Sequence, residues 1–426
     1  MKIEEIYQCF LQCESISTDT RKIEPNSLFI ALKGDTFDAN TFAQEALNKG
    51  ALFVIIDNKT YHTDQDKMIL VSDSLKTLQQ LANYHRRQLG LPIIALTGSN
   101  GKTTTKELIN SVLSKKYNTK ATIGNLNNHI GVPLTLLSFN GDTDIGIVEM
   151  GANHQKEIEE LCNITEPDFG YITNFGKAHL DGFGGIEGVI KGKSELYTYL
   201  EKNQKTAFVN TDDSIQVEKT NTITRYTFGK QANSNIVINS VSANPFVKIG
   251  FSDKTIQSQL IGIYNANNIN AAITIGKYFN IEEDAIKDAI ETYTPTNNRS
   301  QLIEKGTNQI ILDAYNANPS SMSAALTNFI QLDSKQKTAI LGDMFELGKE
   351  SLKEHKKIVD SLKKETNIQV FFIGKDFFLN RIAENHLYFF ESYDDFSKQY
   401  NKKPQNSTIL IKGSRGMALE RTLELL

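Results

Sequence analysis

The chain has 426 residues, of which 23 % are charged and 39 % hydrophobic, and its formal net charge is −4 at pH 7. A chain of this length exceeds one ordinary hydrophobic core, and we expect about three domains. No apolar run approaches the roughly 18 residues of a membrane span, so we expect no membrane insertion. A slightly acidic chain without a basic tract has no general attraction for nucleic acid. Any anionic ligand must therefore be held by specific sites.

The N-terminal stretch and the cysteines both favour a reducing, cytoplasmic compartment. Residues 1–15, MKIEEIYQCFLQCES, include acidic side chains and no uninterrupted apolar segment before a cleavage site, so they do not resemble a signal peptide. Cys9, Cys13 and Cys162 are odd in number and lack metal-ligand pairs. We interpret all three as free thiols.

Residues 1–84 predict a small α/β domain. Strand-like runs begin at Ser27 (SLFIAL), Ala51 (ALFVII) and Met68 (MILVS). A helical stretch, residues 39–49, ends at a glycine, as many helices do. Strands and a helix in alternation are typical of a compact α/β unit.

Residues 92–116, PIIALTGSNGKTTTKELINSVLSKK, predict a strand, a glycine-bearing turn and a helix. The run IIAL is typical of a short buried strand, and the apolar residues after the turn recur at helical spacing. Gly98 and Gly101 allow a tight turn whose consecutive N–H groups point at one anion, and the helix N-terminus adds partial positive charge. The stretch is therefore predicted to bind phosphate.

Two polar side chains extend this phosphate cradle, which we define as residues 97–104. Lys102 is expected to reach the β- and γ-phosphates of a nucleotide, and the Thr103 hydroxyl to bind Mg²⁺, as in P-loop proteins. The sequence departs from the full P-loop pattern at Leu96, where a glycine is usual.

Residues 85–295 predict a larger, central domain of the P-loop ATPase type. Apolar strands end at Glu149 (IGIVEM) and Asn174 (FGYITN), and strand ends are where parallel sheets place their ligands. The runs between 205 and 263 are short and alternating, so they predict an antiparallel patch attached to a parallel sheet. GIYNANNINAAITIGKYF is predicted to be helical, and Pro295 with the polar TNNRS marks a domain boundary.

Residues 296–426 return to alternating strands and helices. Predicted strands end at Asp313 (IILD), Asp343 (TAILGD), Gly374 (QVFFIG) and Gly413 (TILIKG), with helical stretches between them. This alternation predicts a second parallel sheet of the doubly wound, Rossmann-like type.

Glu149 and His179 are candidate metal ligands. A carboxylate at Glu149 can complete a Mg²⁺ shell begun by Thr103 and phosphates, and we favour this over a salt-bridged surface glutamate. His179 follows another strand end in the glycine-rich TNFGKAHLDGFG. It is equally well explained as a ligand or as an ordinary hydrogen-bonding histidine.

Lys193, in KGKSELY, is best explained on physical grounds alone as a plain solvated lysine. If cations lie nearby, its pKa can be depressed, and CO₂ can convert the neutral amine to a carbamate anion able to share a metal ion. Lys191 competes for the same role.

Two amide-rich loops are candidate substrate sites. IGNLNNHIGV contains Asn125, Asn127 and Asn128, which favour sugar or peptide recognition slightly over a simple turn. In DAYNANPSSM, Asp313 ends a strand and Pro319 with a following serine can begin the next helix. A plain strand-to-helix loop explains the proline and serine but not the tyrosine and two amides.

Three cations of the last predicted domain are candidate phosphate ligands. Arg299 lies in TNNRS, and Lys412 and Arg415 lie in KGSRG. They can clamp phosphates from across a cleft, whereas the alternative is ordinary surface charge.

These motifs occur together in one known family. TGSNGKTTT, VEMGANH, TNFGKAHLDGFG, KGKSELY, NNRSQ, DAYNANPSSM, AILGDMFELG and KGSRGM, in this order, resemble the Mur ligases of peptidoglycan synthesis. The resemblance covers almost the whole chain, because STDTRKIEPNSLFIALKGDTFDAN resembles that family's uridine-nucleotide domain. The form TGxNGKT is typical of the family, which accounts for Leu96. One departure is DAN at 38–40, where relatives usually show a glycine and a histidine; it bears on the nucleotide contacts.

The resemblance implies a three-domain ligase that uses ATP to convert a peptide carboxylate to an acyl phosphate, which an amine then attacks. DAYNANP and LGDMFELG are most similar to the branch that joins D-alanyl-D-alanine to UDP-N-acetylmuramoyl-tripeptide. The implied cofactors are ATP, two Mg²⁺ ions and a CO₂-derived carbamate on Lys193. We expect a monomer that binds neither nucleic acid nor membrane.

The resemblance also implies residue roles. The expected catalytic residues are Lys102, Glu149, His179 and Lys193. The expected metal ligands are Thr103, Glu149, His179 and carbamylated Lys193. The expected ATP and phosphate contacts are Gly98, Ser99, Asn100, Gly101, Lys102, Thr103, Thr104, Asn268, Arg299 and Asp313. The expected substrate contacts are Asp19, Thr20 and Arg21 for the uridine nucleotide, Asn125, Asn127 and Asn128 near the muramyl-peptide, and Tyr315, Asn316, Asn318 and Ser321 for the dipeptide.

Two alternatives stay open. A sibling amide ligase, such as folylpolyglutamate synthase or the diaminopimelate-adding enzyme, would share the phosphate cradle and differ in its N- and C-terminal motifs. A P-loop NTPase that acts as a switch or motor would hydrolyse nucleotide without a small-molecule acceptor, and would have no need of DAYNANP or KGSRG. The motifs do not tell whether the tripeptide ends in diaminopimelate or lysine.

Overall fold

The computed structural model describes residues 1–295, 298–400 and 404–426. The boundary predicted at 295/296 adjoins residues 296–297, which lie outside the described residues and include the first two of TNNRS. The chain forms two compact units: residues 1–96, 117–151 and 157–170, and residues 97–116, 152–156 and 171–426. In the described part of the chain, no helix is long and apolar enough to cross a bilayer.

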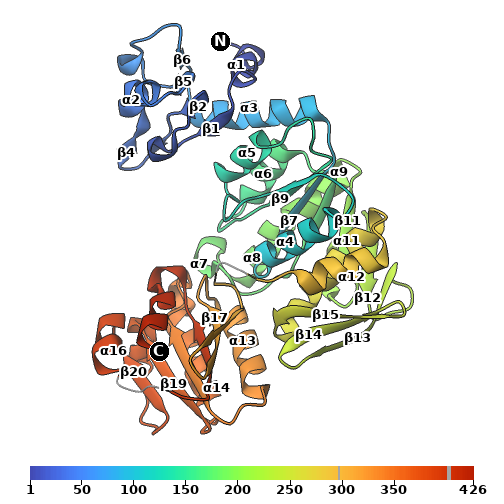
Figure 1. Ribbon diagram of the computed structural model, residues 1–426, viewed down its shortest axis with the longest axis vertical. Coiled ribbons are helices and arrows are strands. Elements are labelled where there is room, and N and C mark those ends of the chain that lie inside the picture. The colour runs from blue at the N-terminus through green and yellow to red at the C-terminus, as the bar shows by residue number, and fades with distance from the viewer. Residues whose placement is uncertain (296–297, 401–403) are drawn as a thin grey trace. The chain divides into compact units, whose positions relative to one another are not determined.

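The first unit begins with a four-stranded parallel sheet in the order β1-β2-β5-β6, drawn in blue in Figure 1. Its strands are β1 (Ser15–Ser17), β2 (Ser27–Ile30), β5 (Phe53–Ile56) and β6 (Met68–Leu70), with the short pair β3 (Lys33–Gly34) and β4 (Phe37–Asp38). Helix α1 (Ile3–Phe10) precedes β1, and helix α2 (Ala43–Asn48) lies between β4 and β5 in the chain. Phe29, Val54 and Ile56 are fully buried in its core, and the three predicted strands are confirmed.

Helix α3 (Ser74–Leu89) follows this sheet and is well capped at both ends. The Asp73 side chain accepts from the backbone N–H of Lys76, and Gly90 ends the helix in the left-handed region, at φ +63°. Arg86 of α3 donates to the backbone oxygens of Thr165 and Glu166, at the end of helix α6 (Glu157–Thr165). These bonds tie α3 to the next part of the unit.

The central sheet has nine strands in the order β15-β14-β13-β12-β11-β10-β7-β9-β8. Their bounds are β7 (Ile93–Thr97), β8 (Thr119–Ala121), β9 (Ile145–Glu149), β10 (Phe169–Ile172), β11 (Thr206–Asn210), β12 (Thr224–Gly229), β13 (Ile236–Ala243), β14 (Phe246–Phe251) and β15 (Lys254–Ile261). Besides α6, the helices between these strands are α4 (Lys102–Leu113), α5 (Gly131–Leu137), α7 (Leu180–Phe183), α8 (Ile186–Lys193), α9 (Glu195–Lys202) and α10 (Ser214–Lys219), and β15 is followed by α11 (Ala266–Tyr278) and α12 (Glu283–Thr292). The predicted strand and helix around the cradle are therefore confirmed.

The antiparallel patch predicted between 205 and 263 is only partly right. β11 and β12 are parallel, and β12 also pairs in parallel with β13 over two residues. Helix α10 separates β11 from β12 and provides the crossover that a parallel pair needs. The antiparallel pairing is confined to β13, β14 and β15, which Figure 1 shows in yellow-green.

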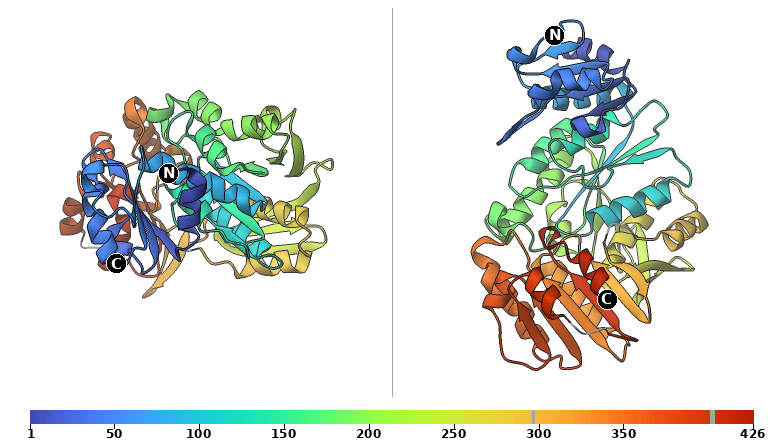
Figure 2. Two further views of the ribbon diagram at one scale, coloured as in Figure 1. Left: turned by 90° about the horizontal axis from the view of Figure 1, so that it is seen from above. Right: turned by 60° about the vertical axis from the view of Figure 1, so that its left-hand side comes forward.

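The last sheet has the order β16-β17-β21-β18-β19-β20 and is drawn in orange and red in Figures 1 and 2. Its strands are β16 (Gln301–Lys305), β17 (Asn308–Asp313), β18 (Lys337–Gly342), β19 (Ile368–Ile373), β20 (Leu387–Phe390) and β21 (Thr408–Lys412), and its helices are α13 (Pro319–Gln331), α14 (Ser351–Leu362), α15 (Lys375–Leu379) and α16 (Tyr393–Gln399). All neighbours are parallel except the hairpin β16–β17. The Rossmann-like prediction is confirmed, although it missed β16 and β20.

Candidate active site

The phosphate cradle forms the turn from β7 to α4, as predicted. Gly98 and Gly101 have φ of +142° and +81°, which side chains rarely allow. A Cβ on Gly98 would lie 2.0 Å from Thr173 Oγ1, and one on Gly101 would lie 2.5 Å from Asn268 Oδ1. Because the glycine that precedes α4 cannot cap it with a side chain, the first N–H groups of the helix are suited to bind an anion.

Hydrogen bonds to neighbouring backbone groups hold the polar residues of the cradle. Lys102 Nζ donates to the backbone oxygen of Gly98 at 2.8 Å, so the lysine folds back over the turn that it is expected to serve. Ser99 Oγ donates to the backbone oxygen of Gly176, and Thr103 and Thr104 are buried. The cradle is therefore ordered as a unit with the loop that follows β10.

The structure brings the predicted ATP residue Asn268 to the cradle. Asn268, in α11, accepts at Oδ1 from Thr105 Oγ1 (3.0 Å) and donates from Nδ2 to Asn265 Oδ1 (2.8 Å). Its side chain lies against Gly101, where any larger residue would clash. Asn268 thus shapes the turn, and its predicted contact with ATP stays a prediction.

Glu149 is a buried carboxylate at the end of β9. It pairs with Leu96, the residue before the cradle, and is 1 % exposed. Its Oε1 accepts from Asn127 Nδ2 at 2.8 Å, whereas Oε2 has no hydrogen-bond partner among the described residues. An ionised oxygen buried without a partner is costly, so a cation in contact with it is a natural complement. Glu149 therefore suits its predicted role as a metal ligand.

The predicted asparagine loop has a structural role that the sequence did not reveal. Asn127 holds Glu149, and Asn128 Oδ1 accepts from the backbone N–H of Ile130 (3.1 Å) and Gly131 (2.9 Å) at the start of α5. Asn125 is exposed. Their predicted place near the muramyl-peptide stays a prediction.

Lys193 is the last residue of α8 and is 1 % exposed, so its interpretation as a plain solvated lysine is wrong. Its Nζ donates to the backbone oxygen of Ala152 at 2.9 Å and lies 5.1 Å from the centre of the Phe183 ring. Lys191 is exposed on the same helix. Burial therefore favours Lys193 over Lys191 for a special role.

His179 precedes α7 with φ +52°, a left-handed conformation uncommon for residues other than glycine. Its Nδ1 is paired with the carboxylate of Glu346, whose pKa this hydrogen bond lowers. Sequence reasoning assigned no role to Glu346, although it lies in the LGDMFELG motif. Within the described residues, no three His, Cys, Asp or Glu side chains form a ready-made metal cluster.

The predicted cations and aromatic residue of the last domain lie together. Lys412 is 1 % exposed, and its Nζ donates to Asp313 Oδ2 at 2.5 Å. The guanidinium carbon of Arg299 lies 3.7 Å from the centre of the Tyr315 ring, and that of Arg415 lies 5.9 Å from it. Two cations on one aromatic ring, beside a buried ion pair, are compatible with the predicted binding of an anion, which stays a prediction.

The loop after β17 leads into α13 through a complete capping box. Asn318 Oδ1 accepts from the backbone N–H of Ser321 (2.9 Å), and Ser321 Oγ accepts from the backbone N–H of Asn318 (3.1 Å). Asn316 Oδ1 accepts from the backbone N–H of Ala317. The predicted start of a helix at Pro319 is confirmed.

In the first unit, the residues predicted to hold the nucleotide form a tight turn. Arg21 donates through Nε and Nη2 to both oxygens of Asp19, at 2.9 and 2.8 Å, and holds the pKa of that carboxyl well below its usual range. The backbone oxygen of Thr20 accepts from Lys49 Nζ. These contacts order the turn without a ligand.

The departure at DAN has a structural explanation. Asn40 is fully buried, and its Nδ2 donates to Asp38 Oδ1 (2.6 Å) and Asp57 Oδ1 (2.8 Å). Its Oδ1 accepts from the backbone N–H of Asp57. Asn40 therefore stabilises the fold of this domain from inside it.

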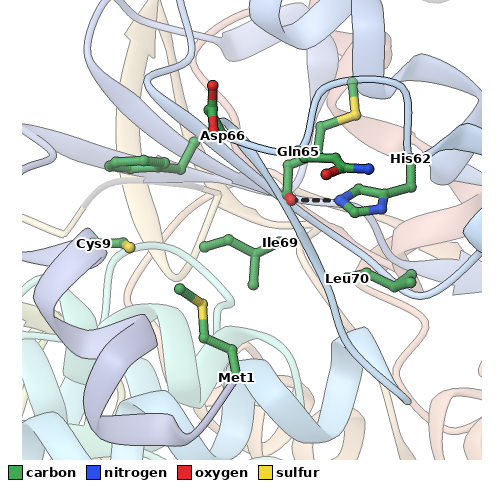
Figure 3. A pocket seen from close by; sticks show the side chains of 9 residues that line it. Met1, Cys9, His62, Gln65, Asp66, Ile69 and Leu70 are labelled. Carbon is green, nitrogen blue, oxygen red and sulfur yellow. Dashed lines mark hydrogen bonds between the residues drawn. The ribbon is translucent and has the colours of Figure 1, made fainter.

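A cavity of about 330 Å³ lies elsewhere in the same unit. Figure 3 shows the side chains that line it. It is lined by Met1, Cys9, Phe53, His62, Gln65, Asp66, Met68, Ile69 and Leu70. None of the predicted site residues is among them. The cavity is therefore separate from the residues assigned above.

The fold and site define a class of protein. Three segments match family descriptions: 12–86 the Mur ligase family catalytic domain, 96–276 the Mur ligase middle domain, and 298–415 the Mur ligase glutamate ligase domain. The chain belongs to the Mur ligase family.

The relatives reported next are all named as one kind of Mur ligase. A protein of Buchnera aphidicola subsp. Baizongia pistaciae named UDP-N-acetylmuramoyl-tripeptide–D-alanyl-D-alanine ligase is 36 % identical, over 98 % of this chain and 93 % of its own. A crystal structure of MurF from Acinetobacter baumannii matches with a TM-score of 0.88 and 29 % identity, over 100 % of this chain and 98 % of that chain. MurF from Thermotoga maritima, in complex with ADP, matches with a TM-score of 0.85 and 26 % identity, over 98 % and 97 %.

Proposed function

We propose that this chain is an ATP-dependent ligase that joins D-alanyl-D-alanine to UDP-N-acetylmuramoyl-tripeptide and gives the pentapeptide, ADP and phosphate. The observation that carries the proposal is the 36 % identity, over nearly the full length of both chains, to a relative that bears the name of this reaction. The ADP complex of a second relative supports ATP as the nucleotide.

The reaction needs negative charge to be stabilised at the cradle. A carboxylate is a poor electrophile, so one of its oxygens first attacks the γ-phosphorus of ATP, and ADP leaves. The amine of D-alanyl-D-alanine then attacks the acyl phosphate, and phosphate leaves from the tetrahedral intermediate with that carboxylate oxygen. The N–H groups at the start of α4 and the ammonium of Lys102 would stabilise the charge that develops on the transferred phosphoryl group.

Two Mg²⁺ ions fit the residues present. Thr103 and Glu149 would hold one ion, and the unpartnered Oε2 of Glu149 supports this assignment. His179 and carbamylated Lys193 would hold the second, and the burial of Lys193 supports its selection over Lys191. When bound, such ions neutralise the phosphate oxygens and polarise the acyl oxygen.

The remaining residues would bind substrates. Asn268, Arg299 and Asp313 would contact ATP, supported by the place of Asn268 at the cradle. Tyr315, Asn316, Asn318 and Ser321 would form the dipeptide site or its approach. Asp19, Thr20 and Arg21 would hold the uridine nucleotide, with Asn125, Asn127 and Asn128 near the muramyl-peptide. The ordered turn at Asp19 supports a preformed site.

We further propose that the protein works in the cytoplasm, because ATP and the uridine nucleotide are cytoplasmic substrates. We also propose that it is a monomer. We propose three domains, 1–84, 85–295 and 296–426, whose sheets each have their own strand order. Closure of such domains on their ligands would exclude water from the acyl phosphate.

The proposal is tested by phosphate release from ATP and Mg²⁺, with the tripeptide nucleotide and the dipeptide added singly and together. We expect release to require both. Glutamate and diaminopimelate replace the dipeptide in separate assays, because a sibling ligase would accept one of them. Release that is indifferent to every acceptor would instead support the NTPase switch and contradict the ligase.

A further inference from the structure

A side-chain hydrogen bond joins the phosphate cradle to the N-terminus of α13. Asn318, the residue before α13, donates from Nδ2 to Oδ1 of Asn100 in the cradle, at 2.7 Å. Asn318 is 6 % exposed. The two residues are 218 positions apart in the chain, so the bond is a tertiary contact between the nucleotide-binding turn and the loop that carries the dipeptide candidates.

Both ends of the Asn318 carboxamide already bind protein. Its Oδ1 accepts from the backbone N–H of Ser321 and caps α13, while its Nδ2 binds Asn100. Each polar atom of this carboxamide therefore has a protein partner on a different segment, the cap on one side and the cradle on the other. The side chain is therefore suited to hold the helix and the cradle together.

The cradle side of the contact is equally fixed. The backbone N–H of Asn100 donates to Asn174 Oδ1 (3.1 Å), and its backbone oxygen accepts from Thr173 Oγ1 (2.6 Å) and Asn174 Nδ2 (2.9 Å). These bonds fix the backbone of Asn100, from which its side chain reaches Asn318. The position of the α13 N-terminus is thus coupled to the conformation of the cradle.

A second bond in parallel supports the same junction. The backbone N–H of Lys177 donates to Ser320 Oγ, in the first turn of α13, at 2.8 Å. A Cβ on Gly176 would lie 2.9 Å from Asn100 Nδ2 and 3.1 Å from Ser320 Oγ, so a side chain at this position would press on both ends of the junction.

We propose that Asn318 is a positioning residue that acts through Asn100: it sets the end of the DAYNAN loop against the phosphate cradle, so that the incoming amine meets the acyl phosphate. This inference rests on the proposed ligase function. It assigns to Asn318 an indirect effect on the affinity for the dipeptide, and no effect of its own on the affinity for ATP.

The test uses a variant that keeps the helix cap and removes the bridge. Serine is as good an N-cap as asparagine, but its shorter side chain does not reach Asn100. In Asn318→Ser we expect kcat/KM for D-alanyl-D-alanine to fall about five- to tenfold, as for the loss of one buried hydrogen bond, and kcat/KM for ATP to change less than about twofold. Calorimetric titration of the dipeptide, with a non-hydrolysable ATP analogue and the tripeptide nucleotide bound, should show the same loss.

A double-mutant cycle separates the bridge from other effects. Asn100→Ala should lower kcat/KM for the dipeptide at least as much as Asn318→Ser does, because Asn100 is also an expected phosphate contact. The double variant should lose no more than Asn100→Ala alone. Ser392→Ala removes another helix cap, which accepts from the backbone N–H of Asp395 in α16, and should reduce stability without a change in kcat/KM.

Each outcome decides one point. Unchanged dipeptide kinetics in Asn318→Ser, multiplied effects in the double variant, or an equal loss in Ser392→Ala would each overturn the inference. If the wild-type protein makes no pentapeptide, the proposed function fails instead, whatever the variants do.

Discussion

Replacing Glu149 by glutamine should make the protein more stable and less active. The carboxylate is 1 % exposed, receives one hydrogen bond from Asn127 and leaves Oε2 without a partner among the described residues. In metal-free buffer it is therefore a buried carboxyl group with little compensation for its polar oxygens. Glutamine has nearly the same shape and no charge, and it keeps an acceptor for Asn127.

The magnitude follows from the burial. Removing one under-compensated buried charge should stabilise the fold by about 1–3 kcal/mol. For a folding unit of about 150–250 residues each kcal/mol raises Tm by about 2–4 °C, so we expect Tm to rise by about 2–12 °C without metal. Turnover should fall at least about a hundredfold, because a ligand of a catalytic cation is lost.

The assay is thermal unfolding with and without Mg²⁺ and ATP, beside turnover as a function of Mg²⁺ concentration. Glu218→Gln is the matched control, since Glu218 is 71 % exposed and paired with its neighbour Lys219, and it should change Tm and turnover little. A Glu149→Gln variant that is less stable than wild type in metal-free buffer, or that keeps the normal dependence on Mg²⁺, would refute the reasoning.

Three further predictions concern other buried groups. Lys193→Ala should abolish turnover, and small carboxylic acids should partly restore it because they replace a carbamate. The control variant Lys202→Ala should be active. Full activity of untreated Lys193→Ala would rule out the carbamate. Lys412→Met should cost about 3–5 kcal/mol in urea unfolding, because it leaves Asp313 with a partly buried, unpaired charge, and a loss under about 1 kcal/mol would contradict this. Burial lowers the pKa of His85, so the unfolded chain binds more protons below about pH 6.5. As the pH falls below that value, the free energy of unfolding of the wild type should decrease by up to about 1.4 kcal/mol per pH unit because of this residue; above that value His85 should have no effect. If the same slope persists in His85→Gln, another group causes it.

Local chemistry explains why the cradle could be predicted from sequence. Gly98, Gly101 and Lys102 lie within five residues, and the strand and helix on either side follow from apolar spacing alone. The end of β9 at Glu149 could be predicted in the same way. Each of these predictions depends on residues that are close in the chain.

Tertiary pairing explains most of what was missed. The parallel pairing of β12 depends on α10, whose role as a crossover is invisible in the alternation of β12 itself. The partnership of His179 with Glu346 joins residues 167 positions apart. The asparagine loop indicated ligand binding, yet Asn127 supports a carboxylate and Asn128 caps a helix, because an amide signals hydrogen bonding without telling to what.

The burial of Lys193 shows the limit of reasoning from a single residue. A lysine in a sequence such as KGKSELY is usually solvated, and the resemblance to a family, rather than its physical chemistry, singled it out. The structure supplies the missing fact, since Lys193 is buried while Lys191, two positions earlier on the same helix, is exposed.

The most direct test of the account follows one oxygen atom. The tripeptide nucleotide is prepared with ¹⁸O in the carboxylate to be joined, and the protein is given ATP, Mg²⁺ and D-alanyl-D-alanine in unlabelled water. Activation through an acyl phosphate predicts one ¹⁸O in each phosphate released and a pentapeptide that has lost one label. Unlabelled phosphate would mean that water attacks ATP directly, and would contradict the ligase mechanism.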